Sequence, residues 1–144
     1  MTGPALSQAE GTSPEIGTPV RVRYADTDQM GVVYYANYLV WFEVGRNEYL
    51  RTVGYPYVEL ERENIRMPVA EATCRYHAPA RYDDLLDIRT RIADVGAASV
   101  RFTYRIVRSS DEQLLATGAT RHAAVGPSGR PCRIPEEVKR CLRG

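Results

Sequence analysis

Two carboxylates stand close together in one short segment, and a glycine follows the second of them after two residues. Asp26 and Asp28 precede Gly31, and a helical pattern begins a few residues later. Unpaired backbone N–H groups and the positive end of the helix dipole at such a junction stabilise a developing oxyanion. A nearby carboxylate can attack a carbonyl held by those amides, or activate a water molecule to do so. The segment is therefore a candidate site for chemistry at a carbonyl.

Asp26 and Asp28 also have a simpler interpretation as turn or capping residues. Aspartate is common where a loop enters a helix, because its side chain accepts hydrogen bonds from nearby backbone N–H groups. The residue types alone leave both interpretations open, so the surrounding elements have to be considered.

The elements on either side of this segment are a strand and a long helix. Val20, Val22 and Tyr24 alternate with arginines, which predicts a strand from Pro19 to about Ala25. From Tyr35 to Val53 the apolar residues recur every three or four positions, which predicts one long helix. Gly54 stands where a C-terminal cap is expected, and a second, short helix is predicted over 57–64.

After Pro68 the hydrophobic pattern changes to a period of two. It predicts four strands, at 70–76, 86–92, 100–106 and 114–125, which are separated by turns at 79–84, 96–98 and 109–112. We expect these strands to form a meander, followed by a short helix from Pro135. A long, mostly apolar helix needs a surface that covers much of its circumference, and a strongly curved antiparallel sheet supplies one. The predicted class is α+β, with about five strands wrapped around a central helix.

Length and charge limit the class of protein. The 144 residues, 44% of them hydrophobic, predict one domain over 19–144 behind a flexible N-terminal arm, 1–18, that is poor in large apolar residues. A net charge of +1 does not favour nucleic-acid binding. The apolar runs are far shorter than the roughly 20 residues of a membrane helix. The first 18 residues do not resemble a secretory signal, so we expect a cytoplasmic protein with no transmembrane segment.

Other kinds of chemistry find little support. The three cysteines include no C-x-x-C pair, which argues against a disulfide framework and a structural zinc site. No Gly-x-Ser-x-Gly motif is present, and His77 and His122 fall on predicted strands. We expect neither a metal nor another cofactor.

Two segments carry a resemblance to a known family. Residues 26–38 read Asp-Thr-Asp-x-x-Gly-Val-Val-Tyr-x-Ala-Asn-Tyr, and residues 76–86 read Tyr-x-x-Pro-Ala-Arg-Tyr-Asp-Asp-Leu-Leu. The first resembles the signature of the 4-hydroxybenzoyl-CoA thioesterase family of hotdog-fold acyl-CoA hydrolases. The second resembles a segment of its Tol-Pal-associated branch. With the matching order of elements, the likeness covers about residues 19–135.

The resemblance implies a hotdog fold and the hydrolysis of an acyl-CoA to a carboxylic acid and CoA. By it, Asp28 is the catalytic carboxylate, and Tyr35 polarises the thioester carbonyl through its backbone N–H. Gly31, Val32 and Tyr34 would be substrate-binding, with Gly31 letting the loop pass close to the thioester. Relatives in the Tol-Pal-associated branch carry histidine at the position of Tyr35, but a backbone donor does not require a particular side chain.

The resemblance also implies features beyond the loop. Glu43 is a backup catalytic carboxylate, because some related hotdog thioesterases place a catalytic glutamate on the helix. Residues 95–99, which match the turn that carries the basic CoA-phosphate cluster of the family, have no positive charge. Phosphate contacts would then come from other positions, although surface arginines are commonly only solvated; the candidates are Arg101, Arg121, Arg130 and Arg133. A homodimer or homotetramer is expected, with the site between subunits.

Two other functions stay open at this stage. A hydratase or dehydratase could use the same fold, although neither histidine is near the Asp28 segment in the sequence. A non-catalytic acyl-CoA-binding or scaffold protein could keep the same aspartate. The sequence does not distinguish between Asp28 as nucleophile and as general base, and it does not give the size of the acyl group.

Overall fold

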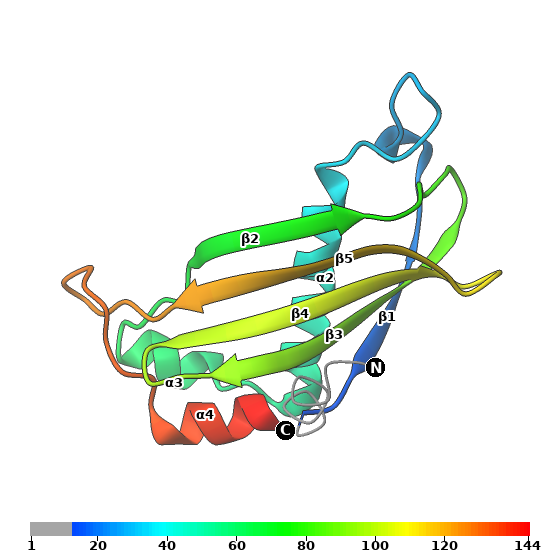
Figure 1. Cartoon of the computed structure of the whole chain (residues 1–144). Coiled ribbons are helices and arrows are strands. Elements are labelled where there is room, and N and C mark those ends of the chain that lie inside the picture. Colours follow the sequence, from blue (N-terminus) through cyan, green and yellow to red (C-terminus); the bar gives the residue numbers. More distant parts are fainter. Residues whose placement is uncertain (1–12) are drawn as a thin grey trace.

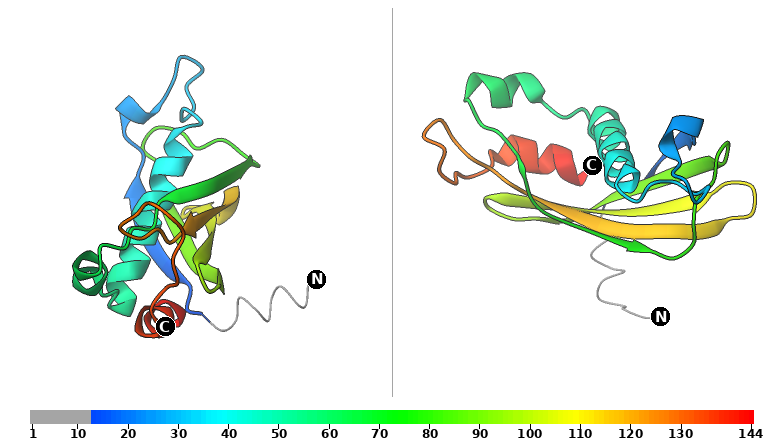
Figure 2. Two further views of the ribbon diagram at one scale, coloured as in Figure 1. Left: turned by 90° about the vertical axis from the view of Figure 1, so that its left-hand side faces the viewer. Right: turned by 90° about the horizontal axis from the view of Figure 1, so that it is seen from above.

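The computed structural model describes residues 13–144, so most of the predicted N-terminal arm, residues 1–12, lies outside the described range. Within it, the chain forms a five-stranded antiparallel sheet with α-helices packed on one face (Figures 1 and 2). The elements are β1 (Ile16–Arg21), the 3-10 helix η1 (Tyr24–Asp26), α2 (Asn37–Val53), α3 (Tyr57–Arg62), β2 (Val69–Tyr76), β3 (Leu85–Val95), β4 (Ser99–Arg108), β5 (Gln113–Ala123) and α4 (Glu136–Arg143). The predicted α+β class is confirmed.

The strand order is β1-β3-β4-β5-β2, which corrects the predicted four-stranded meander. Strands β3, β4 and β5 do follow one another through the predicted turns, but β2 pairs with β5 and lies at the edge of the sheet. The turn at 79–84 is therefore a crossover rather than a hairpin. The physical reason lies in burial: the inner residues of β3 and β4 are buried, whereas β2 is exposed along nearly its whole length, which only an edge strand tolerates.

Helix α2 crosses the inner face of the curved sheet and forms the core with it (Figure 1). The ring of Phe42 stacks on Tyr104 of β4, with centroids 4.4 Å apart. Gly45 and Gly118 permit this close approach, because a Cβ on Gly45 would lie 2.5 Å from Thr90 Oγ1 and one on Gly118 would lie 2.4 Å from the Phe42 ring. Most of the stripe that the periodicity predicts is buried, but Leu39, which the pattern also assigned to it, is exposed. The buried residues of α2 are Tyr38, Trp41, Phe42, Gly45, Tyr49 and Leu50.

The C-terminal half of α2 is held by α4. The hydroxyl of Tyr49 donates to the carbonyl oxygen of Leu142 at 2.8 Å, and Val138 and Leu142 are buried. Gly54 ends α2 in the left-handed conformation, with a φ of 75°, as the sequence predicts. In residues 13–144 no helix combines the length and the hydropathy needed to cross a membrane.

The boundaries of the two elements on either side of the Asp28 segment differ from the prediction. The first strand begins at Ile16 rather than Pro19 and ends at Arg21 rather than Ala25, because the side chain of Asp26 accepts the backbone N–H of Arg23 and turns residues 24–26 into η1. Helix α2 begins at Asn37 rather than Tyr35. Both differences leave Asp28 and Tyr35 in a longer loop between elements.

Candidate active site

The loop between η1 and α2 is a short, narrow hairpin that stands above the N-terminal start of α2 (Figure 1). Thr27 pairs with Val33, and the N–H of Asp28 donates to the carbonyl of Val32 at 2.9 Å. Gly31 closes the hairpin with a φ of 81°, a conformation that favours glycine, and its N–H donates to the Asp28 carbonyl at 3.0 Å. The backbone therefore fixes the position of Asp28 at the tip of the loop.

The carboxylate of Asp28 is only partly engaged. Its Oδ1 accepts the backbone N–H of Met30 at 2.9 Å. The other oxygen, Oδ2, makes no hydrogen bond to any residue from 13 to 144, and none of the ion pairs in that range involves Asp28. The side chain is partly exposed. One oxygen is thus held in place, and the other is free to act on a substrate or a water molecule.

Asp26 has a different, structural position. It is 5% exposed, and its carboxylate accepts the guanidinium of Arg23 at 2.9 Å and the Arg23 backbone N–H at 2.9 Å. Burial alone would raise the pKa of Asp26, but these hydrogen bonds and the charge of Arg23 outweigh it and hold the pKa below its ordinary value. Its carbonyl accepts the N–H of Tyr34 and the side-chain amide of Asn37, each at 2.9 Å. Asp26 therefore ties the base of the loop to the start of α2.

Two backbone donors remain free where the loop enters α2. Within the described chain, the N–H groups of Tyr35 and Ala36 have no hydrogen-bond acceptor, whereas the N–H groups of Asn37, Tyr38 and Leu39 donate to carbonyls three residues back. The side chain of Tyr35 is 62% exposed. Free amides at the positive end of a 17-residue helix are suited to an oxygen that gains negative charge.

The second segment of the sequence resemblance braces this loop from the side. The N–H of Val33 donates to the carbonyl of Ala80 at 2.9 Å, and the N–H of Ala80 donates to the hydroxyl of Tyr38 at 3.1 Å. The hydroxyl of Tyr76 donates to the carbonyl of Tyr35 at 2.9 Å. Two motifs about 40 residues apart thus form one structural unit.

Tyr76 is a residue to which the sequence reasoning gave no role. Its ring lies 4.9 Å from that of Tyr38 and 6.4 Å from that of Tyr35, measured between centroids. Burial, together with the neighbouring Cys74, raises the pKa of Tyr76 far above its ordinary value, so its hydroxyl stays a donor. The only signal in the sequence for a role of Tyr76 is its place at the start of the second motif. The sequence does not show which strand packs beside Tyr35.

The other predicted site residues divide into two groups. Gly31, Val32 and Tyr34 lie in the same loop as Asp28, and Tyr34 is 47% exposed with its ring 4.8 Å from that of Tyr35. Glu43 is exposed on α2, six residues beyond its first residue and thus roughly 9 Å along the helix axis. The structure places it away from the Asp28 loop of the same chain.

The four arginine candidates for CoA phosphates also lie outside the loop. Arg101 and Arg121 are paired opposite each other on β4 and β5, and Arg121 lies 3.7 Å from a carboxylate oxygen of Glu71. Arg130 and Arg133 are exposed between β5 and α4. Neither histidine joins the loop: His77 is exposed and contacts Thr117, and His122 on β5 is buried, with its Nδ1 bonded to the carbonyl of Met67.

Comparison with known proteins gives a consistent family. Residues 22–142 match the thioesterase-like superfamily. The chain is 39% identical over 124 residues to the acyl-CoA thioesterase YbgC of Haemophilus influenzae, covering 84% of this chain and 89% of that protein. It is 43% identical over 96 residues to the acyl-CoA thioester hydrolase YbgC of Escherichia coli O157:H7, covering 67% of this chain and 72% of that protein.

A solved structure agrees with this. The hypothetical protein TT1821 from Thermus thermophilus superposes with a TM-score of 0.80 at 40% identity, covering 90% of this chain and 95% of that one. The family match covers both motifs and every strand from β2 to β5. The chain therefore belongs to the thioesterase-like superfamily and is a thioesterase with the hotdog fold.

Proposed function

We propose that Asp28 and the backbone N–H of Tyr35 carry out the hydrolysis of an acyl-CoA thioester to a carboxylic acid and free CoA. The chain is an acyl-CoA thioesterase by its family and its relatives. The observation that carries the residue assignment is the free oxygen of the Asp28 carboxylate in a loop that ends at two unpaired helix-start amides. These are the two groups that cleavage at a carbonyl needs.

In the proposed reaction, the N–H of Tyr35 donates to the thioester oxygen as it gains negative charge. Asp28 then acts in one of two ways. Its carboxylate attacks the carbonyl carbon, the C–S bond breaks, CoA leaves and water hydrolyses the anhydride; or it takes a proton from a water molecule that attacks the same carbon. Either route consumes one water and yields the acid and the thiol of CoA.

The substitution Asp28→Asn tests the assignment. It keeps the size of the side chain and the hydrogen bond from Met30, but it removes the charge and basicity. We expect kcat to fall on the order of 100-fold or more with an unchanged circular dichroism spectrum. Glu43→Gln, measured in parallel, should keep near-normal turnover. Near-normal turnover of Asp28→Asn together with a loss in Glu43→Gln would transfer the carboxylate role to the helix.

A panel of acyl-CoA substrates from short aliphatic to aromatic chains separates hydrolysis from the other two functions. Release of free CoA supports the hydrolase, whereas tight binding of every thioester without release would make the chain a binding protein. Hydration of crotonyl-CoA without release of CoA would make it a hydratase. The ratios of kcat/KM across the panel also give the acyl specificity.

The active form proposed here is a dimer that pairs through the β2 side of the sheet. Among residues 13–144 no strand pairs with the outer edge of β2, and the strand is exposed along nearly its whole length. Beside it, α2 exposes Leu39 and Val40 at 42% and 54%. Apolar residues gathered next to a free strand edge are typical of a protein interface. A cytoplasmic location stays the prediction made from the sequence.

A further inference from the structure

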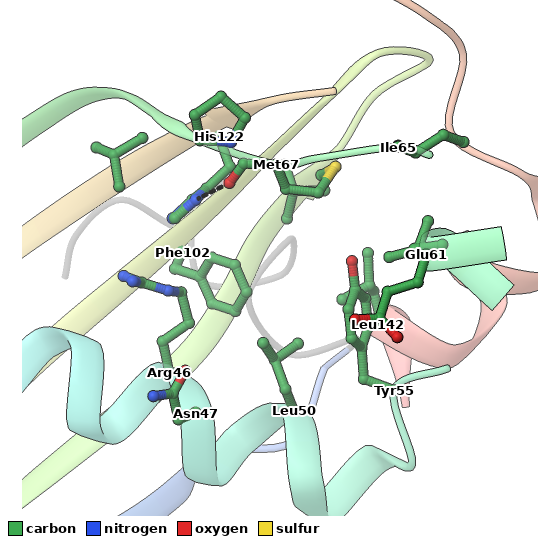
Figure 3. A pocket seen from close by; sticks show the side chains of 14 residues that line it. Arg46, Asn47, Leu50, Tyr55, Glu61, Ile65, Met67, Phe102, His122 and Leu142 are labelled. Carbon is green, nitrogen blue, oxygen red and sulfur yellow. Dashed lines mark hydrogen bonds between the residues drawn. The ribbon is translucent and has the colours of Figure 1, made fainter. Parts of the chain in front are cut away.

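A cavity lies between α2, α3 and the sheet, and no residue of the Asp28 loop lines it. It is a cavity of about 360 Å³ whose apolar wall includes Leu50, Val100, Phe102 and Leu142 (Figure 3). This volume is within the range of small-molecule sites. At roughly 30 Å³ for each small group, the share of one liquid water, it holds about twelve non-hydrogen atoms.

One cation faces this apolar cavity. Arg46 rises from α2 toward the sheet, below His122 and beside Phe102 (Figure 3). Its position, nine residues beyond the start of α2, is roughly 14 Å along the helix axis from the end that bears the Asp28 loop. Glu61 also lines the cavity, but on the opposite side. The cavity therefore carries a positive charge on one side and a negative charge on the opposite side.

Arg46 is the first donor of a chain of hydrogen bonds that ends at the carbonyl of Met67. A carbonyl only accepts, so His122 donates from Nδ1 to the Met67 carbonyl at 3.2 Å, and its Nε2 accepts from the Thr120 hydroxyl at 2.9 Å. The Thr120 oxygen then accepts from the hydroxyl of Tyr104 at 2.6 Å, and the Tyr104 oxygen accepts from Arg46 at 3.2 Å. Every member is neutral except Arg46, which stands at the donor end of the chain.

Arg46 is left without a negative partner. No carboxylate in residues 13–144 lies within ion-pair distance of it, whereas Arg89 pairs with Asp87 and Arg108 pairs with Asp84. A guanidinium carries five N–H donors, and the bond to Tyr104 uses one of them. Because a partly buried cation without a counterion is unfavourable, an anion in the cavity would stabilise it.

We propose that this cavity binds a medium-length chain that ends in a carboxylate, with the carboxylate on Arg46 and the chain against the apolar wall. Arginine suits a carboxylate because its N–H groups match the two oxygens in a fork. Decanoate, with twelve non-hydrogen atoms, matches the volume. The carboxylate has two possible sources: a free acid, or the far end of an acyl group that already carries a carboxylate.

Calorimetric titration with decanoate and with decanamide, its neutral counterpart, tests the proposal. The wild type should bind decanoate at least tenfold more tightly, and Arg46→Met should remove that preference while it binds decanamide as before. Arg46→Lys should restore part of it. Arg51→Met is the matched control, since Arg51 lies on the same helix but is exposed and paired with Glu48. Equal affinity for the two ligands, or an unchanged preference in Arg46→Met, would overturn the proposal.

A kinetic arm distinguishes the two sources. If the carboxylate belongs to a substrate, Arg46→Met should lower kcat/KM at least tenfold for the CoA thioester of decanedioic acid and leave decanoyl-CoA unchanged. If it belongs to a free acid, the variant should lose the preference for decanoate over decanamide and hydrolyse both thioesters in the wild-type ratio. This kinetic arm rests on the proposed function, because it measures the hydrolysis of acyl-CoA, whereas the titrations do not.

The titration is repeated with Asp28→Asn so that the two proposals fail separately. This variant should bind decanoate with wild-type affinity, because Arg46 lies roughly 14 Å along the helix axis from the start of α2, where the Asp28 loop joins the helix. Normal turnover by Asp28→Asn would contradict the catalytic assignment and leave the cavity proposal standing. Loss of decanoate binding in Asp28→Asn would contradict the separation of the two sites.

Discussion

At the scale of single residues, the start of α2 depends on hydrogen bonds from residues outside the proposed catalytic pair, Asp28 and Tyr35. Asp26 holds the base of the loop through Tyr34 and Asn37. Tyr76 holds the carbonyl of Tyr35 through one hydroxyl. An oxyanion site is effective only when its donors are fixed before the reaction begins. Positioning residues of this kind should therefore affect kcat more than the stability of the fold.

The substitution Tyr76→Phe makes that argument testable. It removes the hydroxyl and keeps the ring contacts with Tyr35 and Tyr38. We expect kcat to fall by roughly three- to tenfold, about the value of one neutral hydrogen bond, with little change in KM or in Tm. Steady-state kinetics and thermal unfolding measure both. A rise in KM at constant kcat would indicate that Tyr76 contacts the substrate instead.

His122 predicts how the stability of the protein depends on pH. Its burial, and secondarily the charge of Arg46, lower the pKa of His122 below its ordinary value of 6.5. The unfolded chain then binds more protons than the folded one just below pH 6.5, so the free energy of unfolding decreases as pH falls through that region. Protonation would also make both ring nitrogens donors, which reverses the bond from Thr120.

Urea denaturation at several pH values measures this effect. The range from about pH 7.5 to about pH 5 spans roughly one unit or more on each side of the ordinary histidine pKa. The wild type should lose stability on the acid side, and His122→Gln should show a flatter profile. His77→Gln is the control, because His77 is exposed and lies on the opposite side of β5 from the core. If the free energy of unfolding of His122→Gln depended on pH as steeply as that of the wild type, groups other than His122 would cause the pH dependence.

At the scale of elements, the contact between α2 and the sheet requires glycine at two positions. At Gly118 on β5, a methyl group would lie 2.4 Å from the Phe42 ring and 2.5 Å from the carbonyl oxygen of Thr73. The second of these is a backbone atom of β2, which has little freedom to move. The substitution therefore strains the packing of the helix and the pairing of the edge strand together.

Gly118→Ala should lower the free energy of unfolding by about 1–3 kcal/mol, the usual cost of overpacking a core. Gly96→Ala is the matched control, since a methyl group there would lie no closer than 3.4 Å to Ser99 in the hairpin between β3 and β4. Chemical denaturation should show a shifted midpoint for the first variant and almost none for the second. Equal midpoints would mean that the helix can move away from the sheet at little cost.

The elements also show which parts of the fold could be predicted. The long helix, its glycine cap and the alternating strands were predictable because periodicity and caps are local properties. The position of β2 was not, because strand order depends on which faces are buried against partners far away in the sequence. The small side chains of β2 are compatible with pairing to more than one strand. In the structure β2 pairs with β5.

At the scale of the whole molecule, one chain leaves an apolar surface that its own elements do not cover. Leu39 and Val40 on α2 are exposed next to the open edge of β2. If this surface forms the proposed dimer, a charge placed there should separate the subunits without unfolding the chain. The proposed site between subunits would lose activity at the same time.

Val40→Glu tests the assembly. We expect the sedimentation equilibrium mass to fall to that of one chain, 16.2 kDa, and the hydrolysis of acyl-CoA to fall with it. Val58→Glu on α3, at a residue 64% exposed that is on neither α2 nor β2, should leave both unchanged. A dimer that persists in Val40→Glu would place the interface elsewhere.

The sequence by itself determined the type of most elements and the two motifs, because these depend on residue types at short spacing, and it predicted a catalytic role for Asp28. The tertiary structure decided that the second motif braces the first, through Tyr76 and Ala80. It also decided that Glu43 stands apart from the loop and that Arg46 faces an apolar cavity. These relations depend on which side chains meet across the sheet and the helix, and no local pattern of residues contains that information.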